Sequence, residues 1–345
     1  MSDQTRIGKA KLKKDLEKMG LTKGDHVAVT LSFKAIGFVE NGPDDLIDAL
    51  LEVIGPDGTL MMNTYTKVFP VYEVDPRFVF DYKSTPCNTG LVPETLRMRK
   101  EALRSKHPAC SVVAIGRKAK CLTEGHDENA SRFLPYLRLG QMGGKYLCIG
   151  IGNRLVAIRH EAQRLAGLFD VVRLFNGVQY LDYKGNTRMF AYPESPCPNK
   201  LPDLVPKMQK AGVLTMGKIG NARSVVASAG ELISYMAQKL REDPALTLCD
   251  DVGCLWCREV ERRLKLYSAV KNPMYFQKIV LLRTFIALVN NFRLRKFNYL
   301  FFRKRGKMGA FVESLGNRMN LPSALTWFFN GFIRDLQYLL WDLLH

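Results

Sequence analysis

The residues with the clearest potential for proton chemistry are five histidines, at positions 26, 107, 126, 160 and 345. An imidazole exchanges a proton near neutral pH, so histidine is the usual general base of an enzyme. His160 follows a predicted buried strand over 145–152, which ends in glycine, and opens a predicted helix over 160–167. Enzymes of the α/β class commonly place active-site residues after such strands. We therefore predict that His160 is a general base; the alternative is a histidine that caps or packs near a helix start.

Two other segments have residue types that suit a ligand rich in phosphate. A turn over 32–37 follows a predicted strand over 26–33 and contains a lysine and a glycine. Backbone N–H groups at a glycine turn, together with a fixed cation, bind phosphate. The alternative for this turn is an ordinary connection between a strand and a loop. The second segment contains His107, and here the alternative is a rigid His-Pro turn before the predicted strand over 110–116.

The eight cysteines include one cluster with a spacing that zinc sites use. Near its N-terminus the chain is basic and has no apolar signal core, which predicts a cytoplasmic protein with reduced thiols. Cys249, Cys254 and Cys257 could hold a structural metal if Cys197 supplied a fourth ligand. They are weak candidates, because no second C-x2-C pair and no neighbouring histidine accompany them. We favour buried thiols and predict that no metal takes part in the chemistry.

The formal net charge of +18 is concentrated toward the C-terminus. Residues 268–345 contain 12 Lys and Arg against 3 Asp and Glu, which gives +9, and they contain 15 of the 35 aromatic residues. No apolar run there reaches the ~18–20 residues needed to cross a bilayer. Basic and aromatic residues in alternation suit a helical appendage on an anionic membrane surface. The alternatives are packing on the body, assembly of a homo-oligomer and, least favoured, nucleic-acid binding, for which no motif is present.

The rest of the chain, 1–265, has the composition of one globular domain, with 47% hydrophobic residues over the whole sequence. Hydrophobic periodicity predicts helix, strand, helix and strand over the first 66 residues, which is typical of an α/β fold. The predicted strands cover 26–33, 58–66, 110–116 and 145–152, with a hairpin over 178–192. The predicted helices cover 8–20, about 42–55, 91–100, 160–167 and 231–244. We therefore divide the chain into an α/β domain, 1–265, and a basic aromatic-rich helical appendage, 268–345.

Five motifs, in order, resemble the aminoglycoside 3-N-acetyltransferase family. They are VTLSFKAIGFVENGPDDLIDALLEVIGPDGTLMMNTYT, TPCNTGLVPETLRMRKEALRSKHPACSVVAIG, LGQMGGKYLCIGIG with a histidine eight residues later, MGKIGNA, and a helix that ends in REDPALTL. The resemblance covers about 8–248. It implies a single layered α/β/α domain with a central mixed sheet. It also implies direct transfer of an acetyl group from acetyl-CoA, as co-substrate, to an amine of an amino sugar, without a metal.

The resemblance assigns roles to the residues that match its motifs. His160 matches the catalytic histidine of the family. The predicted cofactor-binding residues come from the turn over 32–37 and from the second motif; they are Ser32, Lys34, Ile36, Gly37, Arg104, Ser105, His107 and Ser111.

This sequence departs from the family pattern at positions that bear on catalysis and on the acceptor. The family usually has an acid three residues after the histidine, where this chain has Gln163. Either another acid, such as Glu161 or Glu94, assists His160, or the base is weaker, or the substrate differs; we place Glu161 in the catalytic set. Thr30 stands where members often have a histidine, and no acidic loop suited to a polycationic antibiotic is evident. The predicted acceptor is an amino sugar, either an aminoglycoside or a surface-glycan precursor. The alternative function is that of a non-catalytic relative, a membrane-docked binding or assembly protein.

Overall fold

The computed structural model describes residues 6–70, 73–151, 156–168, 175–193 and 204–249, together with Cys257 and Glu261. The chain divides into two units, 1–264 and 265–345. The second unit lies outside the described residues, as do Cys197 and Cys254, so the predicted domain division and helical appendage stay predictions. Within the described ranges, no helix has the length and the apolar character needed to cross a membrane.

The described part of the chain alternates between helices and strands. The helices are α1 (Lys9–Lys18), α2 (Phe33–Ile36), α3 (Pro43–Ile54), α4 (Leu91–Arg97), α5 (Ala119–Thr123), α6 (Leu134–Gln141), α7 (Val156–Leu165), α8 (Val205–Lys210) and α9 (Ala229–Glu242). The strands are β1 (His26–Leu31), β2 (Thr59–Asn63), β3 (Phe69–Pro70), β4 (Val79–Phe80), β5 (Leu103–Arg104), β6 (Val112–Gly116), β7 (Lys145–Ile149), β8 (Phe175–Leu181), β9 (Thr187–Pro193), β10 (Leu214–Ile219) and β11 (Ala222–Ser228).

A seven-stranded sheet forms the centre of the fold, in the order β10-β11-β7-β1-β2-β6-β5. Its three middle strands are parallel, because β1 pairs in parallel with both β2 and β7. The outer strands β6 and β11 pair antiparallel with β2 and β7. The sheet is therefore mixed, as predicted.

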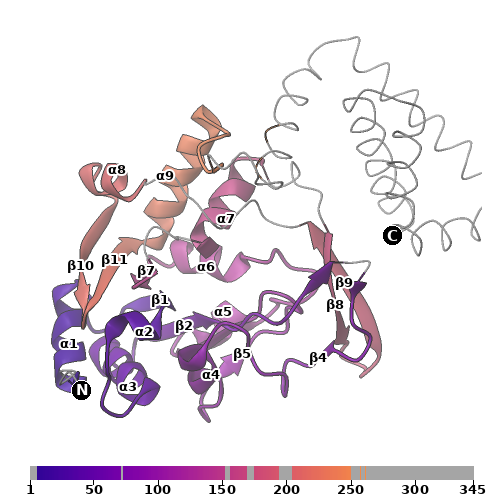
Figure 1. The fold of residues 1–345 in the computed structure, drawn as a ribbon, viewed down its shortest axis with the longest axis horizontal. Helices are drawn as coiled ribbons and strands as arrows, with labels where there is room; N and C mark the ends of the chain where they lie inside the picture. The colour runs from indigo at the N-terminus through magenta and orange to yellow at the C-terminus, as the bar shows by residue number, and fades with distance from the viewer. Residues whose placement is uncertain are drawn as a thin grey trace, which may run out of the picture. The chain divides into compact units, whose positions relative to one another are not determined.

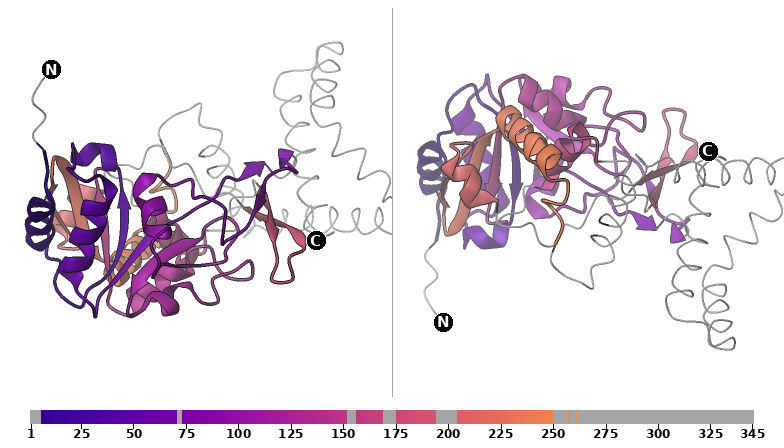
Figure 2. Two further views of the ribbon diagram at one scale, coloured as in Figure 1. Left: turned by 90° about the horizontal axis from the view of Figure 1, so that it is seen from below. Right: turned by 90° about the horizontal axis from the view of Figure 1, so that it is seen from above.

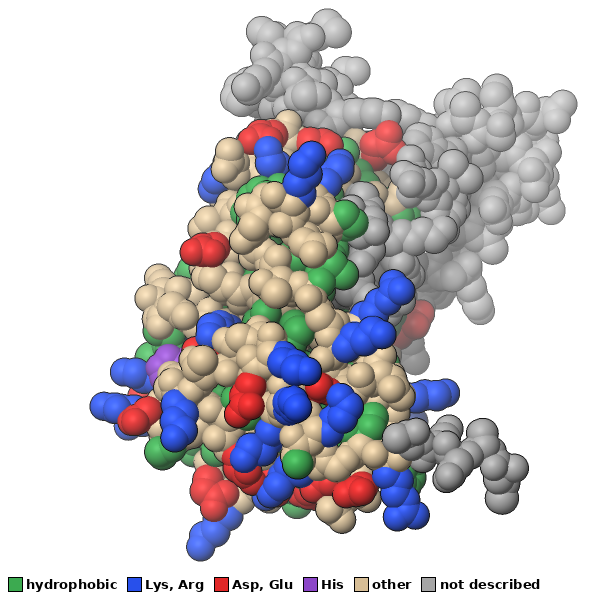
Figure 3. All heavy atoms as spheres, turned by 90° about the vertical axis from the view of Figure 1, so that its left-hand side faces the viewer, with side chains coloured by type: hydrophobic (Ala, Val, Ile, Leu, Met, Phe, Trp, Pro, Cys, Tyr) green, Lys and Arg blue, Asp and Glu red, His purple; other side chains and the backbone are tan. Residues whose placement is uncertain are grey.

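Helices cover both faces of this sheet, which confirms the predicted α/β/α layering. Side chains alternate across a strand, so Val27 and Val29 of β1 pack with α1 and α3, whereas Ala28 faces the other side, against α6, α7 and α9. Figure 1 shows α6, α7 and α9 on one side of the sheet and α1 and α3 on the other. α1 is fixed to α3 by ion pairs of Lys9 and Lys13 with Glu52. Figure 3 shows lysines and arginines interspersed with acidic residues on this face of the molecule, not gathered into one basic patch.

A second, smaller sheet contains β3, β8 and β4, with β9 paired to β8. Figure 2 shows the β8–β9 hairpin standing out from the layered body. A separate buried cluster holds this sheet to the body: Phe80, Val178 and Tyr192 pack with Ala109 and Cys110, which precede β6. The small sheet is therefore anchored beside the start of β6.

Most of the predicted elements are present. The four predicted strands correspond to β1, β2, β6 and β7, the hairpin to β8 and β9, and the helices to α1, α3, α4, α7 and α9. The prediction that His160 opens its helix is wrong, because α7 begins at Val156 and places His160 one turn further on. The elements that were not predicted from the sequence are mostly short or amphipathic only over a few residues; they are β3, β4, β5, α5, α6, α8, β10 and β11.

At Gly116, the last residue of β6, the backbone lies so close to the backbone of Gly58 and Thr59 that only glycine fits. Its φ is +118°, and a Cβ built there would lie 2.8 Å from Thr59 Cα and even nearer the Gly58 carbonyl oxygen. We expect Gly116→Ala to lower the free energy of unfolding by at least about 2 kcal/mol, since strained backbone and overlap add. Gly185→Ala is the matched control, because Gly185 has φ +80° in an open hairpin turn, and it should cost about 1 kcal/mol. Equal urea midpoints for the two variants would contradict the proposed overlap.

Candidate active site

The carboxyl ends of β1, β2 and β7 meet at one edge of the central sheet because the three strands are parallel neighbours. β6 starts at the same edge, where Val112 pairs with Asn63. The described segments that leave or enter this edge are 32–37, 64–70 and 105–111, together with residues 150 and 151 after β7. The predicted cofactor-binding residues lie in these segments except Arg104, which is in β5, whereas the predicted catalytic residues His160 and Glu161 lie on α7 itself. This is the edge at which open α/β sheets bind ligands.

His160 lies on α7 with its imidazole buried. Its Nδ1 is 2.9 Å from Oε1 of Gln163, one helical turn on. The amide nitrogen of Gln163 donates to Oγ1 of Thr247 at 3.1 Å, which orients the amide oxygen toward the imidazole. An amide oxygen only accepts, so Nδ1 carries the proton and Nε2 keeps its lone pair. The arrangement leaves one nitrogen of His160 able to accept a proton.

The surroundings of His160 keep the imidazole neutral. Burial lowers its pKa well below the ordinary value of 6.5, and the positive charges of Arg159 and Arg132 lower it further. The hydrogen bond that Nδ1 donates to Gln163 raises the pKa, but this effect is smaller than those of burial and of Arg159. A neutral imidazole at pH 7 has the lone pair that a general base needs.

Neither acid predicted to assist His160 has its carboxylate bonded to the imidazole. Glu161 accepts from Arg164, with distances from 2.5 to 3.1 Å, along the same helix. Burial raises the pKa of Glu161, and the ion pair with Arg164 partly offsets this. Glu94 accepts from Arg97 and from the backbone of Cys87. The position beside Nδ1 that an acid would occupy is held by a neutral amide.

Arg104 and Ser111 join the loops at this edge through buried hydrogen bonds. The guanidinium donates to the carbonyl oxygens of Thr64 at 2.9 Å, Tyr82 at 3.4 Å and Thr85, and to Ser111 Oγ at 3.2 Å. Ser111 donates to the carbonyl oxygen of Thr64 at 2.6 Å. Burial lowers the pKa of Arg104 to about 10. In this structure both side chains hold the loop after β2 against the segment before β6.

Ser105 and His126 form a second buried pair. Nε2 of His126 lies 3.2 Å from the carbonyl oxygen of Arg132, which can only accept, so this nitrogen donates. The other nitrogen, Nδ1, then accepts from the Ser105 hydroxyl at 2.9 Å. Ser105 Oγ also accepts from the N–H of Val112 at 2.9 Å. The pair fixes the backbone at Arg132.

The tautomer of His107 also follows from its partners. Its Nδ1 accepts from the backbone N–H groups of Ala109 at 3.2 Å and Cys110 at 3.0 Å. The proton of the neutral imidazole is therefore on Nε2, which is buried and has no hydrogen-bond partner in the part of the chain that the structure describes. Burial lowers the pKa of His107 well below 6.5, and neighbouring His126 and Arg132 reinforce this.

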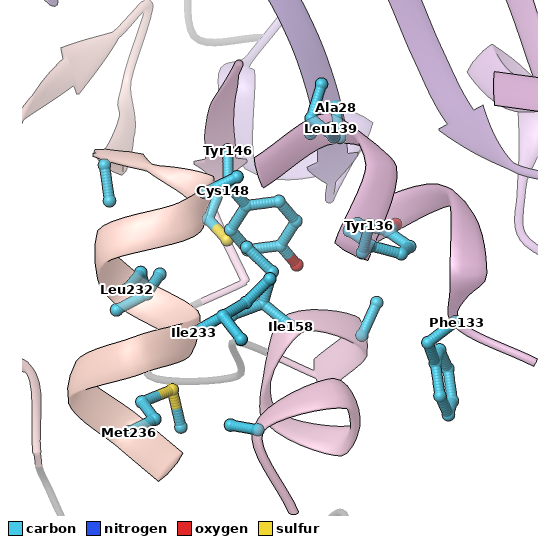
Figure 4. Close-up of a cluster of buried hydrophobic side chains, with 14 of the residues drawn as sticks. Ala28, Phe133, Tyr136, Leu139, Tyr146, Cys148, Ile158, Leu232, Ile233 and Met236 are labelled. Carbon is cyan, nitrogen blue, oxygen red and sulfur yellow. The ribbon is translucent and has the colours of Figure 1, made fainter. Parts of the chain in front are cut away.

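A continuous row of rings and one guanidinium connects His160 to His107; we call it the Arg132 row. Successive separations from His160 are 5.1 Å to Phe133, 5.3 Å to Arg132, 4.3 Å to Tyr192, 5.7 Å to Phe190 and 5.0 Å to His107. Figure 4 shows Phe133 at the margin of the buried cluster that contains Tyr136 of α6 and Ile158 of α7. The row brings the predicted base and a predicted cofactor-binding residue into one region.

Four residues near the site were not predicted from the sequence: Arg132, Phe190, Tyr192 and Thr247. Arg132 follows α5, the two aromatic residues lie on β9, and Thr247 follows α9, so only the tertiary structure brings them to α7. No spacing in the sequence links them to His160. The contact between His160 and Gln163 could be predicted from the sequence, because residues three apart on a helix share a face.

The turn over 32–37 forms the short helix α2 directly after β1. Lys34 is exposed and Ile36 is fully buried. Gly37 has φ +108°, and a Cβ there would lie 2.6 Å from Asn221 Nδ2. Because Gly37 has no Cβ, Asn221, which precedes β11, can pack against the turn.

Two further features concern a cavity and the cysteines. A cavity of about 220 Å³ between α8 and α9 is lined mainly by apolar side chains and includes Thr247 in its wall. The described residues contain no group of three or more histidine, cysteine or acidic side chains that could hold a metal ion. Cys249 donates its N–H to Sγ of Cys257 at 3.2 Å, and both are buried. Because Cys254 is not described, the weak metal prediction is untested.

Comparison with known proteins points to one family. The family profile described as aminoglycoside 3-N-acetyltransferase matches residues 29–241. Aminoglycoside N(3)-acetyltransferase VII of Streptomyces paromomycinus is 31% identical over 194 residues, which is 52% of this chain and 65% of that protein. Aminoglycoside N(3)-acetyltransferase IX of Micromonospora chalcea is 27% identical, over 66% of this chain and 92% of its own. The first of these relatives is thus matched over less than two thirds of its length.

A solved structure titled AAC-IIIb binary with CoASH has 25% sequence identity and a TM-score of 0.60, covering 69% of this chain and 97% of its own. The apoenzyme of aminoglycoside acetyltransferase AAC(3)-IVa, at 23% identity and a TM-score of 0.65, shares the fold over 76% of this chain.

The buried histidines predict a loss of stability in acid. Burial lowers the pKa of His126 to about 4, and those of His107 and His160 are also lowered. An unfolded histidine titrates near 6.5, so as the pH falls from 6.5 toward 4 the unfolded state binds protons that the native state does not. We expect the free energy of unfolding to drop by about 3 kcal/mol for His126 alone across this window. Urea midpoints measured from pH 7.5 to pH 4.5 test this, and constant midpoints would contradict it.

Proposed function

Because the chain belongs to the aminoglycoside 3-N-acetyltransferase family, we propose that it transfers an acetyl group from acetyl-CoA to an amine of an amino sugar, with His160 as general base. The observation that carries this proposal is the state of His160, a buried neutral imidazole with Nδ1 fixed by Gln163. Its lone pair is on Nε2, and the Arg132 row connects the imidazole to His107 at the edge of the sheet. This geometry also disfavours the alternative of a non-catalytic relative.

The reaction requires a proton to leave the amine. The nitrogen attacks the thioester carbon, and a C–N bond forms while the carbonyl electrons move to oxygen. His160 Nε2 then removes a proton from the nitrogen. Collapse of the intermediate breaks the C–S bond, and the thiolate of coenzyme A receives the proton from His160. A weak base suffices, because a nitrogen bonded to the acyl carbon is a stronger acid than a free ammonium.

We assign acetyl-CoA binding to the segments predicted for it, and their parts differ. The exposed Lys34 side chain can reach a phosphate, whereas the backbone N–H of Ser32 already donates to the carbonyl oxygen of Ile149, so we assign Ser32, Ile36 and Gly37 the role of shaping the turn. Arg104, Ser105 and Ser111 act indirectly, since their side chains bond to the protein and shape the loops. The relative solved with CoASH supports this co-substrate.

The class of the acceptor is inferred from the relatives and from the charges near His160. The relatives are named for aminoglycosides, which supports an amino sugar. Among the described residues, the charges that act on His160 are those of Arg159 and Arg132, and both disfavour positive charge there. This favours an acceptor with few amines, such as a precursor of a surface glycan, over a polycationic antibiotic. Acetylation rates for the two acceptor classes would decide between them.

We also propose that the protein works in the cytoplasm with residues 268–345 on an anionic membrane surface. The composition of this segment supports the proposal, with 12 basic residues, 3 acidic residues and 15 aromatic residues. The full chain should sediment with vesicles that contain phosphatidylglycerol but not with phosphatidylcholine vesicles, and truncation after residue 267 should abolish this. Equal sedimentation of both chains would exclude lipid binding by this segment.

The role of His160 predicts a specific loss of turnover. We expect His160→Ala to lower kcat by about 100-fold or more, with little change in the affinity for coenzyme A. His26→Gln is the matched control, because His26 lies at the amino end of β1, at the opposite edge of the sheet. Unchanged kcat in His160→Ala would contradict a general base at this position, and absence of acetyl-CoA turnover in the wild type would contradict the enzyme itself.

The neutral partner of His160 predicts the pH profile. Since the pKa of His160 is below 6.5, the acid limb of kcat/KM should lie below pH 6.5. In Gln163→Glu a carboxylate would face Nδ1 and favour the imidazolium, which should raise the apparent pKa of this limb by about 1–2 units. Thr247→Val is the comparison, because it loosens the amide without adding charge. If the apparent pKa of the acid limb is the same in Gln163→Glu as in the wild type, His160 does not control that limb.

A further inference from the structure

Three buried polar atoms near the start of β6 have no hydrogen-bond partner among the described residues: Tyr65 Oη, Thr66 Oγ1 and His107 Nε2. Native proteins rarely leave such atoms unpaired, because a buried unpaired group costs free energy that a partner would recover. Thr66 also donates its N–H to the carbonyl oxygen of Ala109, whose own N–H bonds to His107, so the loops that carry all three atoms are joined. Unpaired atoms gathered in one place indicate a site that a ligand completes.

Two of these atoms are hydrogen-bond donors. His107 Nε2 carries the proton, because Nδ1 accepts two backbone N–H groups. Tyr65 keeps its hydroxyl proton, since burial raises its pKa well above 10. A ligand atom that satisfies both must be an acceptor, such as a carbonyl oxygen or an anion.

The two donors lie in the same region as His160. Tyr65 packs against the buried cluster around Phe133 and also against the one around Cys110 and Tyr192, so it bridges the two. The charge of Arg132 acts on Tyr65, His107 and His160 alike. His107 and His160 are the two ends of the Arg132 row.

We propose that the Tyr65 hydroxyl and His107 Nε2–H donate to the carbonyl oxygen of the acetyl thioester and stabilise the negative charge that this oxygen acquires. The inference rests on the proposed acetyl transfer and deepens it. When the amine attacks, the C=O π electrons move to oxygen, and they return when the C–S bond breaks. Donors already fixed at the site stabilise this oxyanion without reorganisation, which lowers the barrier. The arginine beside them adds a favourable field.

A buried hydroxyl without a hydrogen-bond partner costs free energy in the unliganded protein, and the variant Tyr65→Phe therefore tests its role. The variant removes one oxygen atom that has no hydrogen-bond partner in the described ranges, so its urea midpoint should equal or exceed that of the wild type. Its kcat should fall by roughly 100-fold, as for removal of one oxyanion donor, with the affinity for coenzyme A unchanged. Tyr136→Phe is the matched control. Its hydroxyl already donates to Asn63 at 2.6 Å, so its loss should lower the midpoint.

The decisive measurement is the infrared carbonyl band of a bound ketone analogue of acetyl-CoA, in which a methylene replaces the sulfur. The band should lie at higher frequency in Tyr65→Phe than in the wild type and should be unchanged in Tyr136→Phe. If Tyr65 binds an acceptor hydroxyl instead, KM for the acceptor rises while the band stays in place, which overturns the inference. Wild-type turnover with normal kcat in Tyr65→Phe overturns the inference alone. No turnover by the wild type overturns the proposed function with it.

Discussion

The parallel pairing of β1 with β2 and β7 determines where everything else in the site can lie. It places three strand ends at one edge, and the antiparallel entry of β6 at Asn63 adds the segment that carries Ser105 and His107. Arg104 and Ser111 then hold the loop after β2 against this segment. The positions of the proposed base and donors thus depend on backbone pairing in the sheet, because these side chains come from segments that are far apart in the sequence.

Burial gives the site its chemical character and also limits its stability. His107, His126 and His160 are all neutral because protonation inside the fold is unfavourable. A neutral imidazole can accept or donate a proton at a defined nitrogen, and the partners of the other nitrogen decide which. The same burial leaves one polar atom each of Tyr65 and His107 without a hydrogen-bond partner among the residues that the structure describes. These features weaken the unliganded protein, and such local conflicts are expected where a protein has a functional site.

The sequence predicted the sheet and its helices well where one hydrophobic face is strongly periodic, as in β1, α3 and α9. It predicted His160 from its place after a glycine-ended strand and from the family motifs. The prediction about Glu161 depended on adjacency in sequence, but neighbouring helical residues point about 100° apart, so Glu161 turns to Arg164 while Gln163 faces the imidazole. Arg132 and Thr247 were out of reach, because only tertiary packing brings them near α7.

A neutral partner for the base has a consequence for the whole catalytic cycle. An imidazolium at His160 would have no carboxylate at Nδ1 to stabilise it, and Arg159 and Arg132 would oppose it. The protonated base is therefore a high-energy state that must pass its proton on quickly. The thiolate that leaves in the same reaction is a ready acceptor, so removal of the amine proton and protonation of coenzyme A are coupled through one imidazole. An oxyanion held by Tyr65 and His107 would lengthen the life of the intermediate in which both transfers occur, and this explains why donors and a weak base would be found together.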